Sequence, residues 1–370
     1  MMDRLDTRQL NRATLDRQLL LRRAARPALD AIGHLTGLQA QAPLAPYVGL
    51  WTRLAGFGHD DLKDLLMERI VVRAHLMRNT VHLVTAADFV RFRPLFQPLT
   101  ERALAGHFGR NLSDLDLAEL RAVAAVLLAE TPLTRGQIGE RLSPRWPDHE
   151  PASLAYAATH LLHLVQVPPR GLWGQRGQAS WFLASAWLGG LTSATPDPDT
   201  ALEQFVLRYL GAYGPATVHD IQAWSGLSRL REVTDRLGAR LRTFTGPDGA
   251  ELLDLPDASR PDADVPAPPR FLPEYDNLLL SFADRSRVIP AARPVPLPPG
   301  NGATTGTLLI DGFWAADWTI TRGRDRAVLE VRPFGPLGLA RQEAVGAEGS
   351  RLLEFAAPAG AHDVRVTPVS

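Results

Sequence analysis

Gln39 and Gln41 are two amide side chains separated by one alanine, in a stretch that ends at Pro43. An amide brings two donors and two acceptor sites that all need partners, so it is a costly choice for a buried position. Its oxygen can accept a hydrogen bond from water and direct a dipole at developing positive charge, although it cannot take up a full proton near neutral pH. The alternative interpretation is that both residues only mark the end of a helix.

The spacing of the two glutamines makes their chemistry depend on the local backbone. Side chains two positions apart point to the same side of an extended chain and diverge on a helix. Residues 27–38 have the apolar periodicity of a helix, which Gly37 weakens and Pro43 stops. The motif therefore lies at a predicted helix end, which leaves both conformations open.

A hairpin is predicted after the motif. Residues 70–85 are rich in β-branched side chains and fold back at Arg78-Asn79. The helices predicted before this hairpin cover residues 5–26, 27–38, 47–54 and 62–68. Several helices followed by a hairpin are typical of a winged helix, and we assign the first such domain to residues 1–110.

The same order of helices and a hairpin recurs twice. In residues 111–190 three predicted helices precede a hairpin that carries Arg170 and Arg176 at its turn. In residues 199–257 the hairpin has an Asp-Gly turn, which is a strong signal. We interpret these segments as the second and third winged helices.

Residues 258–370 differ in composition, because a linker rich in proline and aspartate leads into short predicted strands separated by turns. Two of these strands are expected at residues 278–282 and 288–289. A helix near Leu339–Phe355 and a last strand at Asp363–Pro368 would complete a small antiparallel β-barrel-like domain. The expected fold class is α+β, with three tandem winged helices followed by this domain.

Composition excludes several classes of protein and site. A chain of 370 residues, 45% hydrophobic and 22% charged, is expected to form two to four soluble domains. It has no apolar run that could span a bilayer and no secretory signal, so we expect a cytoplasmic protein without membrane contact. The absence of cysteine excludes disulfides and thiolate chemistry. Nothing resembles a zinc-binding pattern or a phosphate-cradling glycine loop, so neither metal nor cofactor is expected.

Positive charge gathers in the first part of the chain, although the formal net charge is zero. The first hundred residues hold thirteen arginines and Lys63 against nine acidic residues, which fits a local anion-binding face but also chance. Winged helices bind DNA with a recognition helix and a wing, and many others are protein–protein adaptors. We predict nucleic-acid binding, with phosphate contacts from Arg73, Arg78, Arg170 and Arg176.

Several short motifs together resemble one known family. They are Leu38-Gln39-Ala40-Gln41-Ala42-Pro43 with Tyr47 and Leu50, then Arg73, Met77-Arg78-Asn79-Thr80 and His82-Leu83, and the late run Phe271-Leu272-Pro273-Glu274-Tyr275-Asp276-Asn277-Leu278-Leu279-Leu280-Ser281 with Asp284-Arg285. In this order they resemble the bacterial winged-helix (AlkZ-like) family of DNA glycosylases that unhook interstrand crosslinks. The resemblance spans essentially the whole chain and implies three winged helices plus a C-terminal β-barrel.

Two details of the sequence can be compared with the pattern of that family. The Gln-x-Gln form is similar to the branch that gives self-resistance to producers of crosslinking agents such as azinomycin, rather than to the branch with Gln-x-Asp. A histidine commonly follows the Leu-Leu-Ser run in the family, whereas this chain has Phe282. A mechanism that needs that imidazole is therefore not open to it.

The resemblance assigns catalysis to Gln39 and Gln41, in hydrolysis of the N-glycosidic bond of N7-alkylguanine. A guanine alkylated at N7 is already a cationic leaving group, so no general acid has to protonate it. What remains is to place a water molecule and to stabilise positive charge on the sugar. One glutamine would hold the water and the other would face the sugar. The sequence leaves both assignments of these two roles open.

The lysine content limits the reaction further. A glycosylase that also cuts the strand forms a Schiff base with an amine, and Lys63 is the single lysine, on a helix face expected to be solvated. We therefore expect a monofunctional enzyme that leaves an abasic site. Its partner would be double-stranded DNA with alkylated or crosslinked guanine, bound by a monomer. The alternative is a non-catalytic winged-helix DNA-binding protein or transcription regulator.

Crosslinked DNA also constrains the shape of the site. A guanine tied to the opposite strand cannot be flipped into a deep pocket, so an open groove is expected. Residues 298–306 are a candidate for an element inserted into the DNA, or else a mobile surface loop. The polar residues Glu274, Asp276, Asp284 and Arg285 could form a metal or acid–base cluster, but we expect an ion-pair network that braces the last domain.

Overall fold

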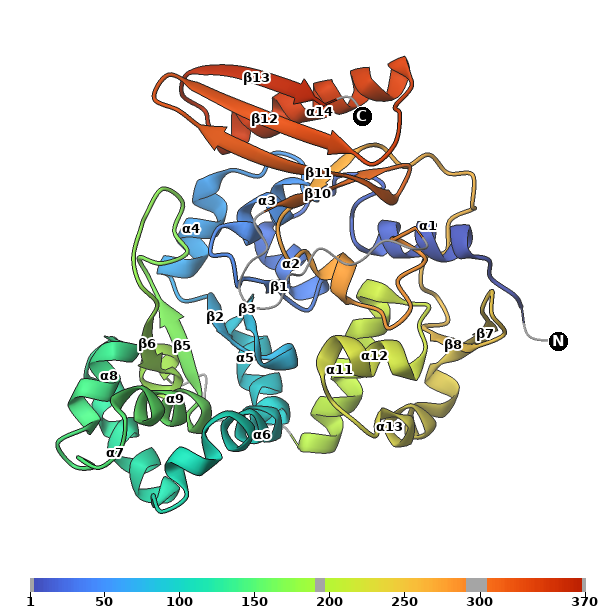
Figure 1. Ribbon diagram of the computed structural model, residues 1–370. Helices are drawn as coiled ribbons and strands as arrows, with labels where there is room; N and C mark the ends of the chain where they lie inside the picture. The colour runs from blue at the N-terminus through green and yellow to red at the C-terminus, as the bar shows by residue number, and fades with distance from the viewer. Residues whose placement is uncertain (1–2, 190–196, 291–304, 368–370) are drawn as a thin grey trace.

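The computed structural model describes residues 3–189, 197–290 and 305–367. It confirms a mixed α+β fold (Figure 1). The first part of the chain lies at the centre of the view, and the helices of the second and third predicted units lie at its lower left and lower right. The C-terminal sheet and its helix form a layer at the top.

The first predicted unit contains a short strand that the sequence did not indicate. Its elements are α1 (Thr7–Arg17), α2 (Ala28–His34), β1 (Leu38–Gln39), α3 (Ala45–Trp51), α4 (His59–Met67), β2 (Val71–His75), β3 (Val81–Thr85), α5 (Ala86–Phe92) and α6 (Gln97–Phe108). The hairpin β2–β3 is confirmed, with a 3-10 turn at Met77–Asn79 between its strands.

Both predicted N-terminal helices are shorter than expected because positive φ angles interrupt them. The helix predicted at residues 5–26 ends at Arg17, and Leu19 then has a φ of 58°. The helix predicted to reach Leu38 ends at His34, and Thr36 and Gly37 follow with φ of 57° and 95°. A right-handed helix cannot contain such residues.

Gly37 is required where the chain turns from α2 into β1. A Cβ at this position would lie 2.5 Å from Val84 Cγ1 and 2.9 Å from the Leu83 carbonyl oxygen of the neighbouring strand. Its positive φ is also one that side chains rarely adopt. The close approach of β1 to β3 therefore depends on the missing side chain.

The second and third predicted units also follow the order of helices and a hairpin. Their elements are α7 (Leu117–Glu130), β4 (Leu133–Thr134), α8 (Arg135–Leu142), α9 (Pro151–Leu161), β5 (Leu164–Val167), β6 (Ser180–Leu183) and α10 (Ala184–Leu188), then α11 (Pro198–Tyr213), α12 (Val218–Ser225), α13 (Leu230–Leu237), β7 (Arg242–Thr245) and β8 (Glu251–Asp254). The predicted Asp-Gly hairpin is confirmed as the pair β7–β8.

The first two hairpins are joined in one sheet. Its strand order is β1-β3-β2-β5-β6-β4, and all its pairings are antiparallel. Strand β2 of the first hairpin pairs with β5 of the second, where Arg73 lies opposite Gln166. Each hairpin thereby covers an edge of the other that would otherwise expose unpaired backbone groups.

The C-terminal strands form an open mixed sheet, so the prediction of a closed antiparallel barrel is wrong. The elements are β9 (Arg270–Leu272), β10 (Gly306–Ile310), β11 (Phe313–Arg322), β12 (Arg326–Pro333), α14 (Leu339–Ala356) and β13 (Ala361–Val366). The order β13-β12-β11-β10-β9 leaves β9 and β13 as two separate edges. Strand β13 runs parallel to β12 because α14 crosses over between them, as parallel neighbours require.

The strands predicted at residues 278–282 and 288–289 are not strands. Residues Asn277–Leu280 form a 3-10 helix, which Asp276 caps by accepting the Leu278 N–H (3.0 Å). The Ser281 hydroxyl donates to the Asn277 carbonyl and closes this turn. Most of the candidate inserted element, residues 298–304, lies outside the described residues.

Three ion pairs, two of them buried on both sides, connect the N-terminal part to later parts of the chain. Arg12 binds Asp311 in the turn between β10 and β11, and Arg17 binds Asp254 at the end of β8. Arg53 makes two bonds of 2.8 Å to Asp276, which confirms Asp276 as part of an ion pair. No group of three or more acidic or histidine side chains that could hold a metal was found among the described residues.

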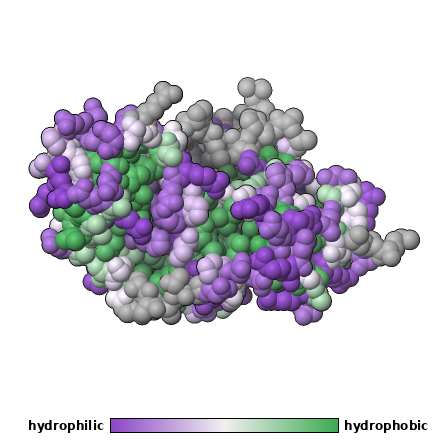
Figure 2. Space-filling model, turned by 90° about the horizontal axis from the view of Figure 1, so that it is seen from below, coloured by the Kyte–Doolittle hydropathy of each residue, from purple (hydrophilic) through white to green (hydrophobic). Residues whose placement is uncertain are grey.

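The surface is of mixed polarity. Figure 2 shows polar side chains interrupted by apolar regions, one of them on the side where α7 to α9 lie in Figure 1. On α7 the side chain of Val126 is 64% exposed. None of the helices in the described ranges combines the length and hydrophobicity needed to cross a membrane.

We predict that Gly37→Ala lowers the free energy of unfolding by about 2–5 kcal/mol, because the positive φ and the overlap with Val84 both oppose a methyl group. Urea denaturation measures the change. Gly106→Ala is the control, since Gly106 lies exposed on α6 and a Cβ there meets nothing within 4 Å. It should be neutral or stabilising by up to about 1 kcal/mol. A Gly37→Ala protein as stable as wild type would contradict the prediction.

Candidate active site at the Gln39–Gln41 motif

Gln39 is held in extended backbone next to the first hairpin. In strand β1 it lies opposite His82 of β3, and its backbone N–H donates to Asn277 Oδ1 at 3.0 Å. Its side-chain Oε1 accepts a bond from Arg78 Nη2 at 2.9 Å. Because a guanidinium group only donates, this bond fixes which end of the Gln39 amide is the oxygen. The side chain is 7% exposed.

Gln41 lies just past the end of the strand and is half-buried. The Ala40 N–H donates to the Val81 carbonyl at 2.8 Å, so the chain is extended as far as Ala40. The Val81 N–H donates to Gln41 Oε1 at 3.3 Å. Of the two alternatives, the chain therefore takes the extended one as far as Ala40, and both amides belong to the edge of the first hairpin.

A cavity of about 300 Å³ opens beside Gln41. It lies at the junction of the two hairpins and the start of α8. Its lining residues are Gln41, Arg73, His75, Val81, Thr134, Arg135, Gly136, Gln166, Arg170, Gln178, Ala179 and Trp181. Gln41 therefore shares a concave surface with three arginines, whereas Gln39 is not among the lining residues.

Arg73 stabilises the backbone of the motif. It is 2% exposed, and it donates to the carbonyls of Ala40 and Pro43, both at 3.0 Å, and to Gln166 Oε1 at 3.2 Å. Burial, and then the nearby Arg170, lower the pKa of Arg73 to about 10. Since protein carbonyls occupy its Nη donors, its placement argues against the direct phosphate contact that the sequence predicted.

Arg78 is also turned inward rather than displayed on a wing. It has a φ of 52° at the hairpin tip and donates to the Trp224 carbonyl of α12 as well as to Gln39. Burial lowers its pKa to about 10. This arginine therefore connects Gln39 to the third unit, which does not favour a phosphate contact for it either.

The two remaining predicted arginines lie on the second hairpin. Arg170 lines the cavity and donates to the Gly177 carbonyl at 2.8 Å. Arg176 is exposed and is not among the residues that line the cavity. The structure thus brings Gln41, Arg73 and Arg170 together, and it leaves Arg176 outside the group.

Sequence reasoning missed Asn277, which fixes the backbone of the motif. Its Oδ1 accepts the Gln39 N–H, and its Nδ2 donates to the Gly37 carbonyl at 2.8 Å and to the Tyr213 hydroxyl at 3.0 Å. Asn277 lies in the late run Phe271–Ser281. Its place in that motif was the one feature of the sequence that could have indicated a role at the site. Arg135 and His75 were missed as well, because only tertiary contacts bring them to the cavity.

A family model described as DNA glycosylase AlkZ-like matches residues 32–355, which include both glutamines and Asn277. The chain belongs to the AlkZ-like DNA glycosylase family. One similar protein is the interstrand DNA cross-link repair glycosylase of Streptomyces sahachiroi, which is 24% identical to this chain over 263 residues. That match covers 67% of this chain and 66% of the relative, just under two thirds of its length.

A solved structure shows that this AlkZ-like chain shares its fold with a known protein. The Streptomyces sahachiroi DNA glycosylase AlkZ matches with a TM-score of 0.74 at 22% sequence identity. The match covers 98% of this chain and 100% of that chain. The arrangement of helices and sheets described above is therefore similar to that of AlkZ from end to end.

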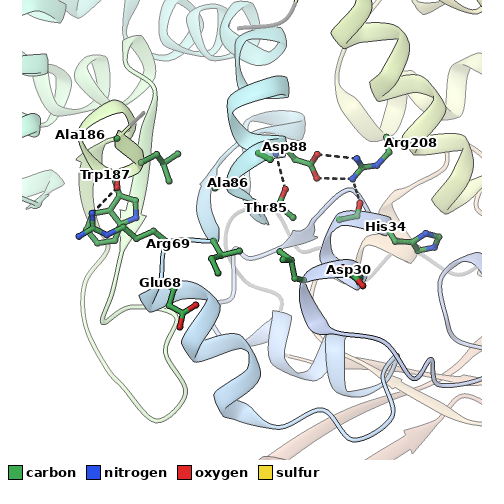
Figure 3. Close-up of a pocket in the computed structure, with 16 residues that line it drawn as sticks. Asp30, His34, Glu68, Arg69, Thr85, Ala86, Asp88, Ala186, Trp187 and Arg208 are labelled. Atoms are coloured by element: carbon green, nitrogen blue, oxygen red, sulfur yellow. Dashed lines mark hydrogen bonds and ion pairs between the residues drawn. The ribbon is translucent and has the colours of Figure 1, made fainter. Parts of the chain in front are cut away.

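The AlkZ-like chain has a second, larger cavity of about 880 Å³ that does not reach the glutamines (Figure 3). There Asp88 pairs with Arg208 at 2.9 Å, and the Arg69 guanidinium lies 4.1 Å from the Trp187 ring centroid. Asp30 and Glu68 add acidic groups to the lining. Strand β3 separates the two cavities, since it begins beside Gln41 and ends about 13 Å away at the residues of the larger one.

His82, opposite Gln39, is an uncharged buried imidazole. Its Nδ1 donates to the Thr80 carbonyl at 2.9 Å, and its Nε2 has no hydrogen-bond partner among the described residues. Burial, and then the charge of Arg78, lower the pKa of His82 to about 3. Strand β3, which pairs with the strand of the motif, therefore holds a neutral histidine.

This gives a prediction for stability against pH. The unfolded chain protonates the imidazole near pH 6.5 and the folded chain only near pH 3, so acid favours unfolding across that window. From this group the free energy of unfolding should fall by up to about 1.4 kcal/mol per pH unit below pH 6.5. Urea denaturation from pH 7 to pH 4 measures the slope, which should be shallower in His82→Leu. Equal slopes in the two proteins would contradict the assignment.

Proposed function

We propose that the chain is a monofunctional DNA glycosylase that hydrolyses the N-glycosidic bond of N7-alkylguanine and unhooks interstrand crosslinks. The observation that carries the proposal is the position of Gln41 at a cavity whose described lining contains three arginines and no carboxylate. Membership of the AlkZ-like family supports the glycosidic reaction, and the activity for which the Streptomyces relative is named supports crosslinked DNA as the substrate.

The lack of an acidic side chain at the cavity agrees with the chemistry of this lesion. A guanine alkylated at N7 departs as a neutral base, because it already carries the positive charge that a general acid would supply. The protein then has to position a water molecule and to offer negative potential to the sugar. Neutral amide oxygens can do both without becoming protonated.

We propose different roles for the two glutamines. Gln41 lines the cavity, which has room for a water molecule, and its Oε1 accepts the Val81 N–H. Gln39 Oε1 instead faces the cationic Arg78, which offsets the negative potential that this oxygen could direct at a sugar. Gln41 is thus the better candidate for holding the water, and Gln39 for orienting the hairpin tip.

The proposal extends to the DNA-binding architecture. The segments 1–110, 111–190 and 199–257 each contain helices followed by a hairpin, which supports their interpretation as winged-helix domains ahead of residues 258–370. We propose that a monomer in the cytoplasm uses them to bind double-stranded DNA. The biological role of this activity would be self-resistance to a DNA-alkylating natural product.

Gln41→Ala should lower the rate of unhooking by about 100-fold or more, because the water would lose its acceptor. Gln39→Ala should lose less, since its oxygen is already bound by Arg78. The assay uses duplexes with a defined N7-guanine crosslink and measures separated strands after alkaline work-up. Gln342→Ala on α14 is the control, because Gln342 is exposed and its side chain bonds only to the Leu337 carbonyl in the described chain. Full turnover by Gln41→Ala would overturn its role.

Lys63 provides a second prediction. It is exposed on α4 and pairs with Asp60, which raises its pKa, so the amine stays protonated. Lys63 is also not among the residues that line the cavity. No covalent protein–DNA adduct should therefore form when borohydride is added during the reaction. A trapped adduct that disappears in Lys63→Arg would show a Schiff-base mechanism instead.

A further inference from the structure

The cavity beside Gln41 carries positive charge that nothing in its lining balances. Arg73, Arg135 and Arg170 all line it, and among the described residues no aspartate or glutamate does. Two other buried arginines of the described chain are each paired with a carboxylate, Arg17 with Asp254 and Arg53 with Asp276. A concave surface with three guanidinium groups and no acid is suited to an anion.

Arg73 shows that this charge is uncompensated inside the protein. The side chain is 2% exposed, yet its Nε has no hydrogen-bond partner in the described structure. Burial and the neighbouring Arg170 both lower its pKa. A buried donor on a charged group is costly to leave unpaired, and the charge of Arg73 adds to the positive potential of the cavity that it lines.

The start of α8 adds partial positive charge at the same place. Helix α8 is eight residues long, and its capping box satisfies the N–H groups of Thr134 and Gln137. The first-turn N–H groups of Arg135 and Gly136 have no partner within the helix, as at any helix start, and both residues line the cavity. A Cβ on Gly136 would meet nothing within 4 Å, so this end is open. Such a terminus attracts phosphate groups.

Arg135 is in position to complete the anion site. It has no carboxylate partner among the described residues, and its guanidinium lies 5.5 Å and 5.8 Å from the ring centroids of Tyr156 and Trp181. The two rings hold the side chain near the cavity without neutralising it. A planar guanidinium in this setting can bind phosphate through two parallel bonds.

We propose that this cavity binds one phosphodiester group of the DNA backbone, next to the nucleotide whose sugar faces Gln41. The inference rests on the proposed function, because it places the lesion beside Gln41. The damaged base does not suit the cavity, since an N7-alkylated guanine is a cation and three arginines would repel it. A phosphate held there would fix the attached sugar relative to the Gln41 amide.

The first test is the salt dependence of binding. Arg135→Ala should reduce the slope of log affinity against log salt for an undamaged duplex by about one, because one phosphate contact is lost. Arg135→Lys should keep most of the slope. Arg141→Ala is the matched control, since Arg141 is exposed near the other end of α8 and does not line the cavity. Equal slopes in wild type and Arg135→Ala would overturn the proposal.

The second test locates the phosphate. Crosslinked duplexes are made with a neutral methylphosphonate at one backbone position at a time around the lesion. Wild type should bind one of these duplexes about 10-fold less tightly than the rest, and Arg135→Ala should not distinguish it. If inorganic phosphate alone protects the wild-type protein against heat while the scan is flat, the cavity is a free-anion site and the DNA proposal is wrong.

The two tests separate this inference from the proposed function. Loss of the salt slope in a protein that does not unhook crosslinks would support the phosphate site and contradict the enzymatic activity. In the other outcome, wild type unhooks crosslinks efficiently, and the losses of DNA affinity from Arg135→Ala and from the methylphosphonate are additive. That result would support the activity and contradict the site. Circular dichroism of each variant establishes that it is folded.

Discussion

The guanidinium group of Arg73 is the contact on which the site depends. It binds the carbonyls of Ala40 and Pro43 on one side and Gln166 of the second unit on the other. A single side chain thus fixes the backbone on both sides of Gln41 and fastens it to the second hairpin, where β2 pairs with β5. Arginine suits this role because its planar group donates in several fixed directions. The motif is held by its main chain, which leaves the Gln41 amide directed towards the cavity.

Gln39 is secured by a different part of the chain. Asn277 binds the backbone on both sides of Leu38, and Arg78 links the Gln39 oxygen to the Trp224 carbonyl. The motif therefore lies where the second unit, the third unit and the late 3-10 helix all meet the first hairpin. Since these contacts are buried and polar, each would be costly to leave unpaired, and together they allow one arrangement of the motif.

The sequence predicted local structure better than long-range contacts. The hairpin at Arg78-Asn79, the Asp-Gly hairpin and the helix near Leu339–Phe355 depend on neighbouring residues, and the structure has all of them. The union of the first two hairpins and the inward turn of Arg73 depend on residues about ninety positions apart, which no local pattern encodes. The open C-terminal sheet was missed for a similar reason, because the residues of β12 and β13 do not indicate that these two strands pair across α14.

Helix α1 adds a constraint on how the molecule is made. Its Arg12 binds Asp311, 299 positions later, and its Asn11 binds the carbonyls of Arg287 and Gly312. When α1 leaves the ribosome none of these partners exists, so the helix must wait, without its native contacts, until most of the chain has been translated. Assembly of the full molecule is therefore a late event, and truncation before the C-terminal sheet would remove Asp311 and Gly312 from the partners of the first helix.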